Sequence, residues 1–304
     1  MTSDQKSMRT GLLLGLGAYL LWGVMPIYFK AVGRIEAPEI VAHRIFWSLP
    51  FLAGLATLWR RWPAIGAAIT TGRVMMILLL TAALIGANWL VFIYAIVAGH
   101  VLEASLGYYL NPLINVLLGV VLLRERLSRA QLFATLLAAA GVAVLAAGAG
   151  AGLWISLTLA GTFSLYGFLR KVAPVDALEG LLIETLILAP LALGWAIWIA
   201  RAGTAGFGHF GIGIDILLAV GGTLTAIPLL LFTAAARRLP YSTLGFLQYL
   251  APSLQFLLAV LAYGEPLTRA HLICFGAIWV ALAIFSIDGL RNSAKTREAA
   301  ATTL

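Results

Sequence analysis

The sequence predicts an all-α membrane protein with ten transmembrane helices in two inverted five-helix repeats. Three observations lead to this fold class: the composition, ten long apolar stretches, and a match of the chain to itself after a shift of 140 residues. Hydrophobic residues make up 62% of the 304 residues and charged residues 11%, and the mean hydropathy is +1.00. This composition supplies too little polar surface for a soluble globule.

Ten apolar stretches are long enough to cross a hydrocarbon core of about 30 Å, which takes roughly 20 helical residues. The first half of the chain supplies residues 11–30, 38–58, 74–97, 102–123 and 128–148. The second half supplies residues 151–169, 177–199, 213–235, 241–262 and 268–287. The stretches are continuously apolar, whereas the strands of a membrane β-barrel alternate, so helices are favoured.

Local signals support several of these elements in turn. The first stretch is longer than the apolar part of a signal peptide and no clear cleavage site follows it, so we expect it to be retained. The second begins at Pro38, which suits a first helical turn, and the fourth ends at the charged residues 124–126. The single cysteine, Cys274, lies in the tenth stretch; it forms no intrachain disulfide and is predicted to pack as a small apolar residue.

The self-match divides the chain into two repeats, residues 1–148 and 149–290, followed by residues 291–304 as a disordered cytoplasmic tail. Tyr109-Leu110-Asn111-Pro112 aligns with Tyr249-Leu250-Ala251-Pro252, and Glu125-Arg126-Leu127-Ser128 aligns with Glu265-Pro266-Leu267-Thr268. Each repeat holds five spans, an odd number, so the second copy enters the membrane from the opposite side. The loop charges agree, because Arg124 and Arg126 align with the uncharged Gly264 and Pro266.

The basic residues predict the orientation, since Lys and Arg collect in short cytoplasmic loops. One side holds most of the 20 cations: Lys6, Arg9, Arg60, Arg61, Arg73, Arg124, Arg126, Arg129, Arg170, Lys171, Arg237, Arg238, Arg291, Lys295 and Arg297. Both termini are therefore predicted to be cytoplasmic. Anionic lipid headgroups are a sufficient partner for the net charge of +8, and no nucleic acid needs to be invoked.

The ten spans, the inverted repeat and the paired Glu-x-Leu-Ser/Thr motifs resemble the drug/metabolite transporter superfamily, in its EamA branch. The resemblance covers almost the whole chain. A further set of motifs resembles one group within that branch: Leu21-Trp22-Gly23, Pro26, Tyr28-Phe29-Lys30, Pro38-Glu39, Ala42-His43-Arg44, Trp47-Ser48, Asn88-Trp89, Tyr94, Glu103-Ala104-Ser105-Leu106-Gly107-Tyr108-Tyr109 and Asn111-Pro112. This resemblance implies a multi-pass permease of the bacterial inner membrane.

Arg44 lies about two turns into the second span, and it aligns across the repeat with Glu184 in the seventh span. Charges inside a membrane are expensive and usually functional. Their placement suggests either a mutual ion pair or two poles of a polar cavity, while the alternative for Arg44 is that it reaches to the headgroups. Glu184 is a candidate proton carrier, and a purely structural ion pair is the competing interpretation.

Aromatic and amide side chains near the centre of the spans complete a predicted substrate-binding set: Trp22, His43, Arg44, Asn88, Trp89, Tyr94, Tyr108, Asn111, Glu184, Gln248 and Tyr249. Such walls suit an amphipathic organic molecule better than an inorganic ion. The alternative is that these residues only bond neighbouring helices together. Four prolines within spans are candidate hinges, with static helix shape as the other explanation: Pro26, Pro112, Pro228 and Pro252.

The sequence holds no phosphate-binding loop, metal-ligand cluster or Ser-His-Asp set, so we expect no enzyme, no cofactor and no metal site. We expect a secondary transporter of small organic metabolites or drugs that works by alternating access, with a proton as candidate coupling ion. A passive channel and a membrane scaffold without transport are the alternatives. Substrate, direction, coupling ion and oligomeric state stay open.

Overall fold

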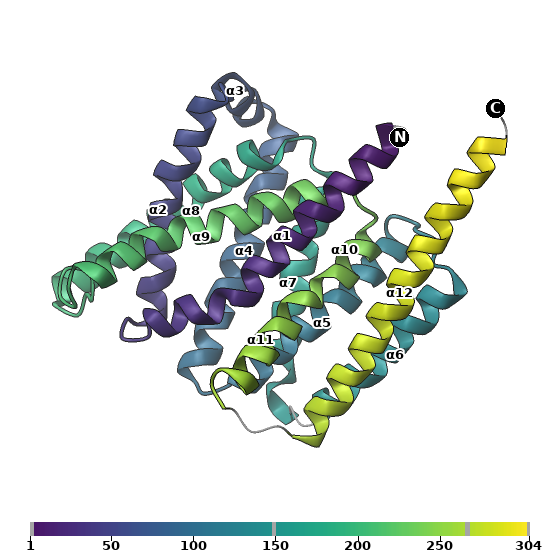
Figure 1. Ribbon diagram of the computed structural model, residues 1–304. Coiled ribbons are helices and arrows are strands. Elements are labelled where there is room, and N and C mark those ends of the chain that lie inside the picture. Colours follow the sequence, from purple (N-terminus) through teal and green to yellow (C-terminus); the bar gives the residue numbers. More distant parts are fainter. Residues whose placement is uncertain (1–2, 148–149, 265–267, 303–304) are drawn as a thin grey trace.

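The structure, a computed structural model, describes residues 3–147, 150–264 and 268–302, and within these ranges it is built from helices without strands (Figure 1). The first half comprises α1 (Ser3–Ala31), α2 (Ala37–Leu58), α3 (Trp62–Thr70), α4 (Gly72–Val97), α5 (Val101–Val121) and α6 (Arg129–Ala146). The second half comprises the 3-10 turn η1 (Gly150–Gly152), α7 (Leu153–Val172), α8 (Ala177–Ala202), α9 (Ile212–Ala236), α10 (Tyr241–Gln248), α11 (Leu250–Leu261) and α12 (Arg269–Thr302).

Nine segments of the described chain are long and apolar enough to cross a membrane, with α10 and α11 together forming one of them. The remaining predicted span, residues 151–169, corresponds to α7, which has 20 residues but a more polar sequence. Its polar side chains Ser156 and Ser164 are buried, because α7 packs against α4, α5 and α9 inside the bundle. The predicted fold class is therefore confirmed.

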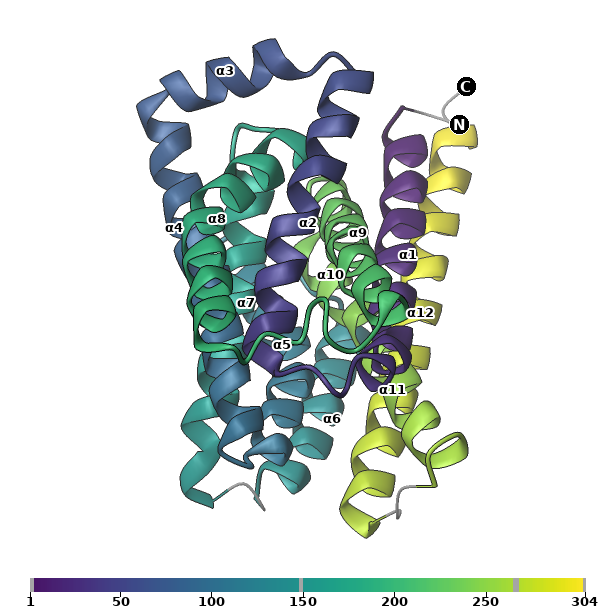
Figure 2. The same ribbon diagram turned by 90° about the vertical axis from the view of Figure 1, so that its left-hand side faces the viewer.

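Two segments differ from the sequence-based prediction. Residues 62–70 form the short helix α3, which lies across the end of the bundle where both chain ends lie (Figure 2). The sequence shows a proline near the start of this helix, and Ile65 and Ala68 anchor it by being buried. Residues 291–302, expected to be disordered, continue α12 as a helix. Glu265, Pro266 and Leu267 of the repeated motif lie outside the described residues.

The ninth predicted span is broken into α10 and α11 at Tyr249. Pro252 supplies the reason, since a proline has no N–H to donate to the carbonyl four residues earlier, here that of Gln248. Its repeat mate Pro112 lies inside the uninterrupted α5. Pro26 and Pro228 likewise lie inside α1 and α9. Among the four predicted hinges only Pro252 accompanies a break, and a hinge motion at any of them stays a prediction.

The helix packing repeats itself between the two halves. Three pairs of equivalent elements pack on each other, α2 with α8, α5 with α10, and α6 with α12. In the first half α1 packs against α9 and α11, and in the second half its counterpart α7 packs against the corresponding α4 and α5. The repeat seen in the sequence is thus a repeat in space, and each half completes the other's packing.

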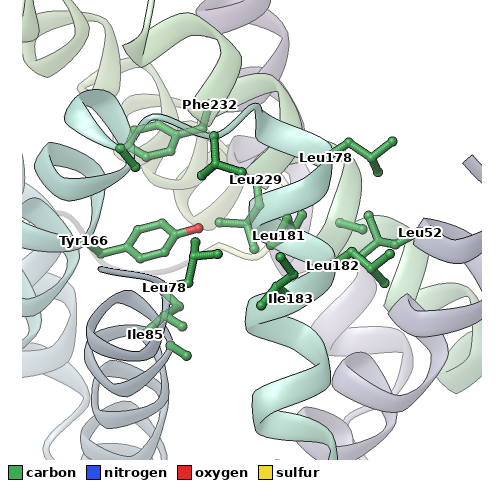
Figure 3. Packing of buried hydrophobic residues seen from close by; sticks show 14 of the residues in the cluster. Leu52, Leu78, Ile85, Tyr166, Leu178, Leu181, Leu182, Ile183, Leu229 and Phe232 are labelled. Atoms are coloured by element: carbon green, nitrogen blue, oxygen red, sulfur yellow. The ribbon is translucent and has the colours of Figure 1, made fainter. Parts of the chain in front are cut away.

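Two apolar cores hold the bundle together. The larger core joins residues of α2, α4, α7, α8 and α9, among them Leu52, Leu78, Tyr166, Leu182 and Phe232 (Figure 3). The second core joins α5, α6, α10 and α12 and contains Cys274, which is fully buried and not in a disulfide, as predicted. Large apolar side chains such as Met76, Leu90 and Leu191 are exposed on the outside, where lipid would cover them.

Glycines allow helices of the two halves to touch. A Cβ at Gly222 of α9 would overlap the backbone of Trp47 in α2. A Cβ at Gly245 of α10 would lie 2.8 Å from the Pro112 carbonyl oxygen in α5. Within a membrane, the hydrophobic effect does not drive helices together, because lipid tails are as apolar as the side chains. Helices then associate through close contacts at small residues such as these.

The inverted topology can be tested with single cysteines in a Cys274→Ala background. Gly66 in α3 and Gly213 at the start of α9 have open space around an added Cβ. Because the basic residues predict cytoplasmic chain ends, we expect an impermeant maleimide to label Gly213→Cys in intact cells and Gly66→Cys only after lysis. Labelling of both positions from the same side would contradict an inverted arrangement.

Candidate functional site

A cavity lies between the two halves of the bundle, with an empty volume of about 930 Å³ that includes space open to solvent. Helices of both repeats contribute its walls: Tyr19, Trp22, Met25, Phe29, Arg44, Ile85, Asn88, Trp89, Phe92, Tyr108, Asn111, Phe163, Thr225, Leu229, Gln248, Ala251, Pro252 and Gln255.

The cavity occupies the half of the bundle away from the chain ends. Its walls follow α1 from Tyr19 to Phe29 and α4 from Ile85 to Phe92, toward the ends of both helices. On α5 they include Tyr108, which lies near the helix start and is 41% exposed. Both chain ends lie at the other end of the bundle (Figures 1 and 2). The cavity is therefore placed toward one membrane face only.

An aromatic cluster closes the cavity toward the chain ends. The ring centroids of Trp22, Phe163 and Phe232 lie 5.4 to 5.8 Å apart, and Tyr19 joins Phe232 at 6.3 Å. Tyr19 and Phe232 are fully buried. Tilted and edge-on rings at this spacing attract one another beyond simple burial of area. The cluster forms a floor made by α1, α7 and α9.

Arg44 is positioned by the opposite half of the chain. It lies two turns into α2, and its Nε donates a 2.6 Å hydrogen bond to the hydroxyl of Thr225 in α9. That hydroxyl donates its own hydrogen to the Gly221 carbonyl at 2.8 Å, so its oxygen faces Arg44 as an acceptor. The guanidinium carbon lies 5.4 Å from the centre of the Phe29 ring. Arg44 thus reaches the cavity and not the headgroups.

The amide side chains bond helices together and also line the cavity. Asn88 donates from its amide nitrogen to the Leu159 carbonyl at 2.8 Å and to the Thr162 hydroxyl at 2.9 Å. Gln248 accepts from Asn115 at 2.7 Å, and Gln255 donates to the Trp22 carbonyl at 3.0 Å. Each of these amides uses one end for a neighbouring helix. The two interpretations from the sequence, cavity wall and interhelical bond, apply to the same residues.

The structure brings together seven of the predicted substrate-binding residues and separates four from them. The seven in the cavity wall are Trp22, Arg44, Asn88, Trp89, Tyr108, Asn111 and Gln248. His43 instead stacks on Phe207 at 4.8 Å. Tyr94 is 49% exposed beside Trp154 and His100. Tyr249 is fully buried against Phe246 in the second core.

Glu184 is the fourth predicted residue that does not line the cavity. It is buried behind the cavity wall and does not pair with Arg44. Its carboxylate lies 3.5 Å from Nε of Arg170 and accepts hydrogen bonds from Thr81 at 2.5 Å and Tyr166 at 3.3 Å. The reason is helix packing: α8 turns Glu184 toward α4 and α7, while α2 turns Arg44 toward α9. Neither of the two expected arrangements is present in this state, because Glu184 pairs with Arg170 and does not line the cavity that Arg44 borders.

Arg170 was counted from the sequence among the loop cations, yet it is fully buried near the end of α7. In addition to its ion pair with Glu184, it donates hydrogen bonds from Nη2 to the carbonyl oxygens of Asp176 and Ala177 at 3.2 and 3.1 Å. Gly180 makes room, because a Cβ at this position would collide with the guanidinium. A glycine four residues before Glu184 on the same helix face was the available signal for a bulky partner there.

Several cavity residues were also missed by the sequence analysis, and helical spacing was the signal that could have found them. Tyr19 and Phe29 lie on the Trp22 face of α1, and Ile85 and Phe92 lie on the Asn88 face of α4. Apolar and aromatic residues at spacings of three, four and seven share one face of a helix. The aromatic lining is therefore a property of whole helix faces.

A second repeated feature joins α2 and α8 at both ends of the bundle. Glu39 and Glu179, which align across the repeat, are both buried. Glu39 of α2 accepts hydrogen bonds of 2.9 Å from the backbone N–H groups of Gly206 and Phe207, in the loop after α8. Glu179 of α8 accepts a hydrogen bond from Arg61, in the loop after α2. Each helix thus holds the loop that follows the other.

Arg61 also pairs with Asp176, which in turn lies 3.3 Å from Arg237. The hydrogen bonds to Glu179 and Asp176 raise the pKa of Arg61 above its ordinary value, so its guanidinium stays charged. These contacts tie α2, α8 and α9 together at the closed end. Among the described residues, no group of three His, Cys, Asp or Glu side chains is placed to hold a metal ion.

Two inverted helical repeats that enclose a polar and aromatic cavity within the span of the membrane are the architecture of a membrane transporter. The EamA-like transporter family matches residues 9–147, the first repeat. An uncharacterized transporter of Vibrio cholerae is 48% identical over 299 residues, which cover 98% of this chain and 99% of that protein. This chain therefore belongs to the EamA-like transporter family, within the drug/metabolite transporter superfamily.

Within the family, the chain is similar to the protein RarD, the group whose motifs the first half resembles. RarD of Escherichia coli strain K12 is 44% identical over 293 residues, which cover 96% of this chain and 99% of that protein. A protein of known crystal structure superposes with a TM-score of 0.71 at 20% sequence identity, over 92% of this chain and 98% of that one. That likeness supports the fold alone.

The buried ion pair makes a prediction about stability. Arg170→Gln leaves the Glu184 carboxylate buried without its cation, which costs about 3–5 kcal/mol in comparable pairs. We expect a clear fall in the unfolding temperature of the purified protein, and partial recovery in Arg170→Gln/Glu184→Gln. Arg73 is exposed at the start of α4, so Arg73→Gln serves as the control for removing a cation that is not buried. Equal stability of Arg170→Gln and the parent chain would contradict a structural role for the pair.

Proposed function

We propose that the protein is a secondary active transporter that carries small organic metabolites or drugs across the bacterial inner membrane by alternating access. The main support for this proposal is the cavity between the two repeats. It lies toward one membrane face and is closed toward the other by the Trp22–Phe163–Phe232 cluster. A passive channel would need a continuous path, and the aromatic floor argues against one.

The inverted repeat also supports the existence of a second state, in which the cavity opens toward the other membrane face. Arg44 and Glu184 occupy equivalent positions, with Arg44 at the cavity and Glu184 sealed beside Arg170. In an inverted repeat the opposite state forms when the two halves exchange conformations. The surroundings of Glu184 would then open as those of Arg44 close. With the chain ends on the cytoplasmic side, the present state faces outward.

Transport can be tested with purified protein in liposomes of mixed neutral and anionic lipids. We expect flux of an organic solute that saturates with concentration, and counterflow of labelled solute into liposomes preloaded with the unlabelled compound. Trp22→Ala is expected to weaken apparent affinity by about tenfold or more through loss of a cavity wall. Tyr94→Ala, outside the cavity, is the matched aromatic control. Flux without saturation or counterflow would favour a channel, and no flux of any solute a scaffold.

We further propose that Glu184 carries the coupling proton. It would bind and release this proton in the opposite state, in which the surroundings of Glu184 are open. Carboxylates within membrane helices often serve proton relays. Glu184→Gln should then retain counterflow, which needs no net driving force, and lose accumulation driven by an imposed proton gradient. If proton-driven accumulation persists in Glu184→Gln, the ion pair with Arg170 is structural only.

A further inference from the structure

We propose that the cargo of this cavity is an organic anion, an aromatic or apolar molecule with an acidic group and no amine, and that Arg44 binds the acidic group. This inference rests on the proposed transport function and deepens it. The main observation is electrostatic, because Arg44 is the one charged side chain among the described residues that line the cavity.

Arg44 lacks the carboxylate partner that the buried Arg170 and the partly exposed Arg61 each have. Arg170 has Glu184 at 3.5 Å, and Arg61 is bonded to Glu179 and Asp176. Lys171 donates to the carbonyl oxygens of Ala236 and Leu239 at 2.7 and 2.5 Å. Within the described part of the chain, Arg44 takes part in no ion pair, and its side chain donates its hydrogen bond to Thr225 through Nε. A guanidinium within a membrane span that lacks a carboxylate partner favours an incoming anion.

The bond to Thr225 fixes the direction in which Arg44 presents its charge. Nε is held from the side of α9, so the terminal amino groups carry the remaining four N–H donors. These donors form a planar fork that matches a carboxylate, sulfonate or phosphate in a two-point contact. The guanidinium carbon also lies 5.4 Å from the centre of the Phe29 ring, within the range of a cation–π attraction. The arrangement is a preformed anion subsite.

The rest of the wall defines the remainder of the molecule. Trp22, Trp89, Phe92 and Tyr108 present aromatic surface, which suits a ring or apolar body. The amide groups of Asn88 and Gln248 are neutral hydrogen-bonding partners. They provide no negative charge for an ammonium group. A zwitterion or a cation would therefore bring its positive charge beside Arg44 without compensation.

Glu184 explains why the cavity stays positive in this state. It is the residue that aligns with Arg44 in the other half, and it could have supplied the opposite charge. Its burial beside Arg170, Thr81 and Tyr166 removes it from the wall. Arg44 at the cavity wall and Glu184 away from it therefore give the cavity its preference for a negatively charged molecule.

The test uses four phenyl compounds of similar size: 3-phenylpropanoate, 3-phenylpropanamide, phenylalanine and 3-phenylpropylamine. A second panel replaces phenyl by naphthyl and indolyl groups. Binding to the purified full chain is measured by calorimetry, and each compound is also tested as an inhibitor of liposome counterflow. We expect a carboxylate to bind at least tenfold more tightly than its amide, zwitterion and amine counterparts.

Variants test whether Arg44 is responsible for the preference for a carboxylate. Arg44→Gln should remove the advantage of the carboxylate and leave amide binding within about twofold, and Arg44→Lys should retain part of it, because the charge remains without the fork. Thr225→Val, which frees Nε, should weaken carboxylate binding less than Arg44→Gln does. Arg73→Gln is the control for a cation removed elsewhere, and unfolding temperatures verify that each variant is folded.

Equal binding of carboxylate and amide, tighter binding of the amine, no binding by any acid of either panel, or an undiminished preference in Arg44→Gln would overturn the anion proposal. These outcomes are separate from failure of the transport proposal. If neutral or cationic solutes show saturable counterflow, the protein is a transporter with another cargo. If no solute of any charge moves, the transport function itself fails.

Discussion

The ion pair between Arg170 and Glu184 holds the closed half of the structure together. Neither charge can face lipid, so each depends on the other and on groups from neighbouring helices, Thr81 of α4 and Tyr166 of α7. Satisfying them requires α4, α7 and α8 to meet at one point. Gly180 permits this meeting by leaving space for the guanidinium. The aromatic floor of the cavity lies next to it, because Tyr166 contacts both Glu184 and Phe163. The closed end is therefore built on one electrostatic contact surrounded by rings.

The same position in the other half is arranged differently, although the backbone repeats. Arg44 has a neutral partner in Thr225, and it borders the cavity. The two halves thus place one satisfied and one available charge at equivalent depths. In a symmetric fold this difference is what distinguishes the open half from the closed one. The reciprocal bonds of Glu39 and Glu179 to the loops after α8 and α2 join the halves outside the cavity. They make α2 and α8 a connected unit.

Belonging to the EamA-like transporter family gives this arrangement its functional setting, but the family alone does not select a cargo. The selection follows from local chemistry: aromatic surface, neutral amides and one guanidinium. The residues of the cavity wall come from eight helices, which are drawn from both halves of the sequence. Their convergence on one cavity is a consequence of the packing of α5 on α7 and α10, of α1 on α9 and α11, and of α2 on α9. A small change in that packing would alter which charge the cargo meets.

Apolar length and the self-match of the chain were enough to determine the number of spans, the inverted repeat and the buried state of Cys274, because these follow from local hydrophobicity and odd span number. Seven residues of the cavity wall, including Trp22, Arg44 and Gln248, were also predicted from the sequence, since polar and aromatic groups avoid lipid. Only the tertiary structure decided the partners. Glu184 pairs with Arg170 and not with Arg44, and His43 stacks on Phe207 outside the cavity. Such choices depend on the rotation and approach of helices distant in sequence, which no local pattern encodes.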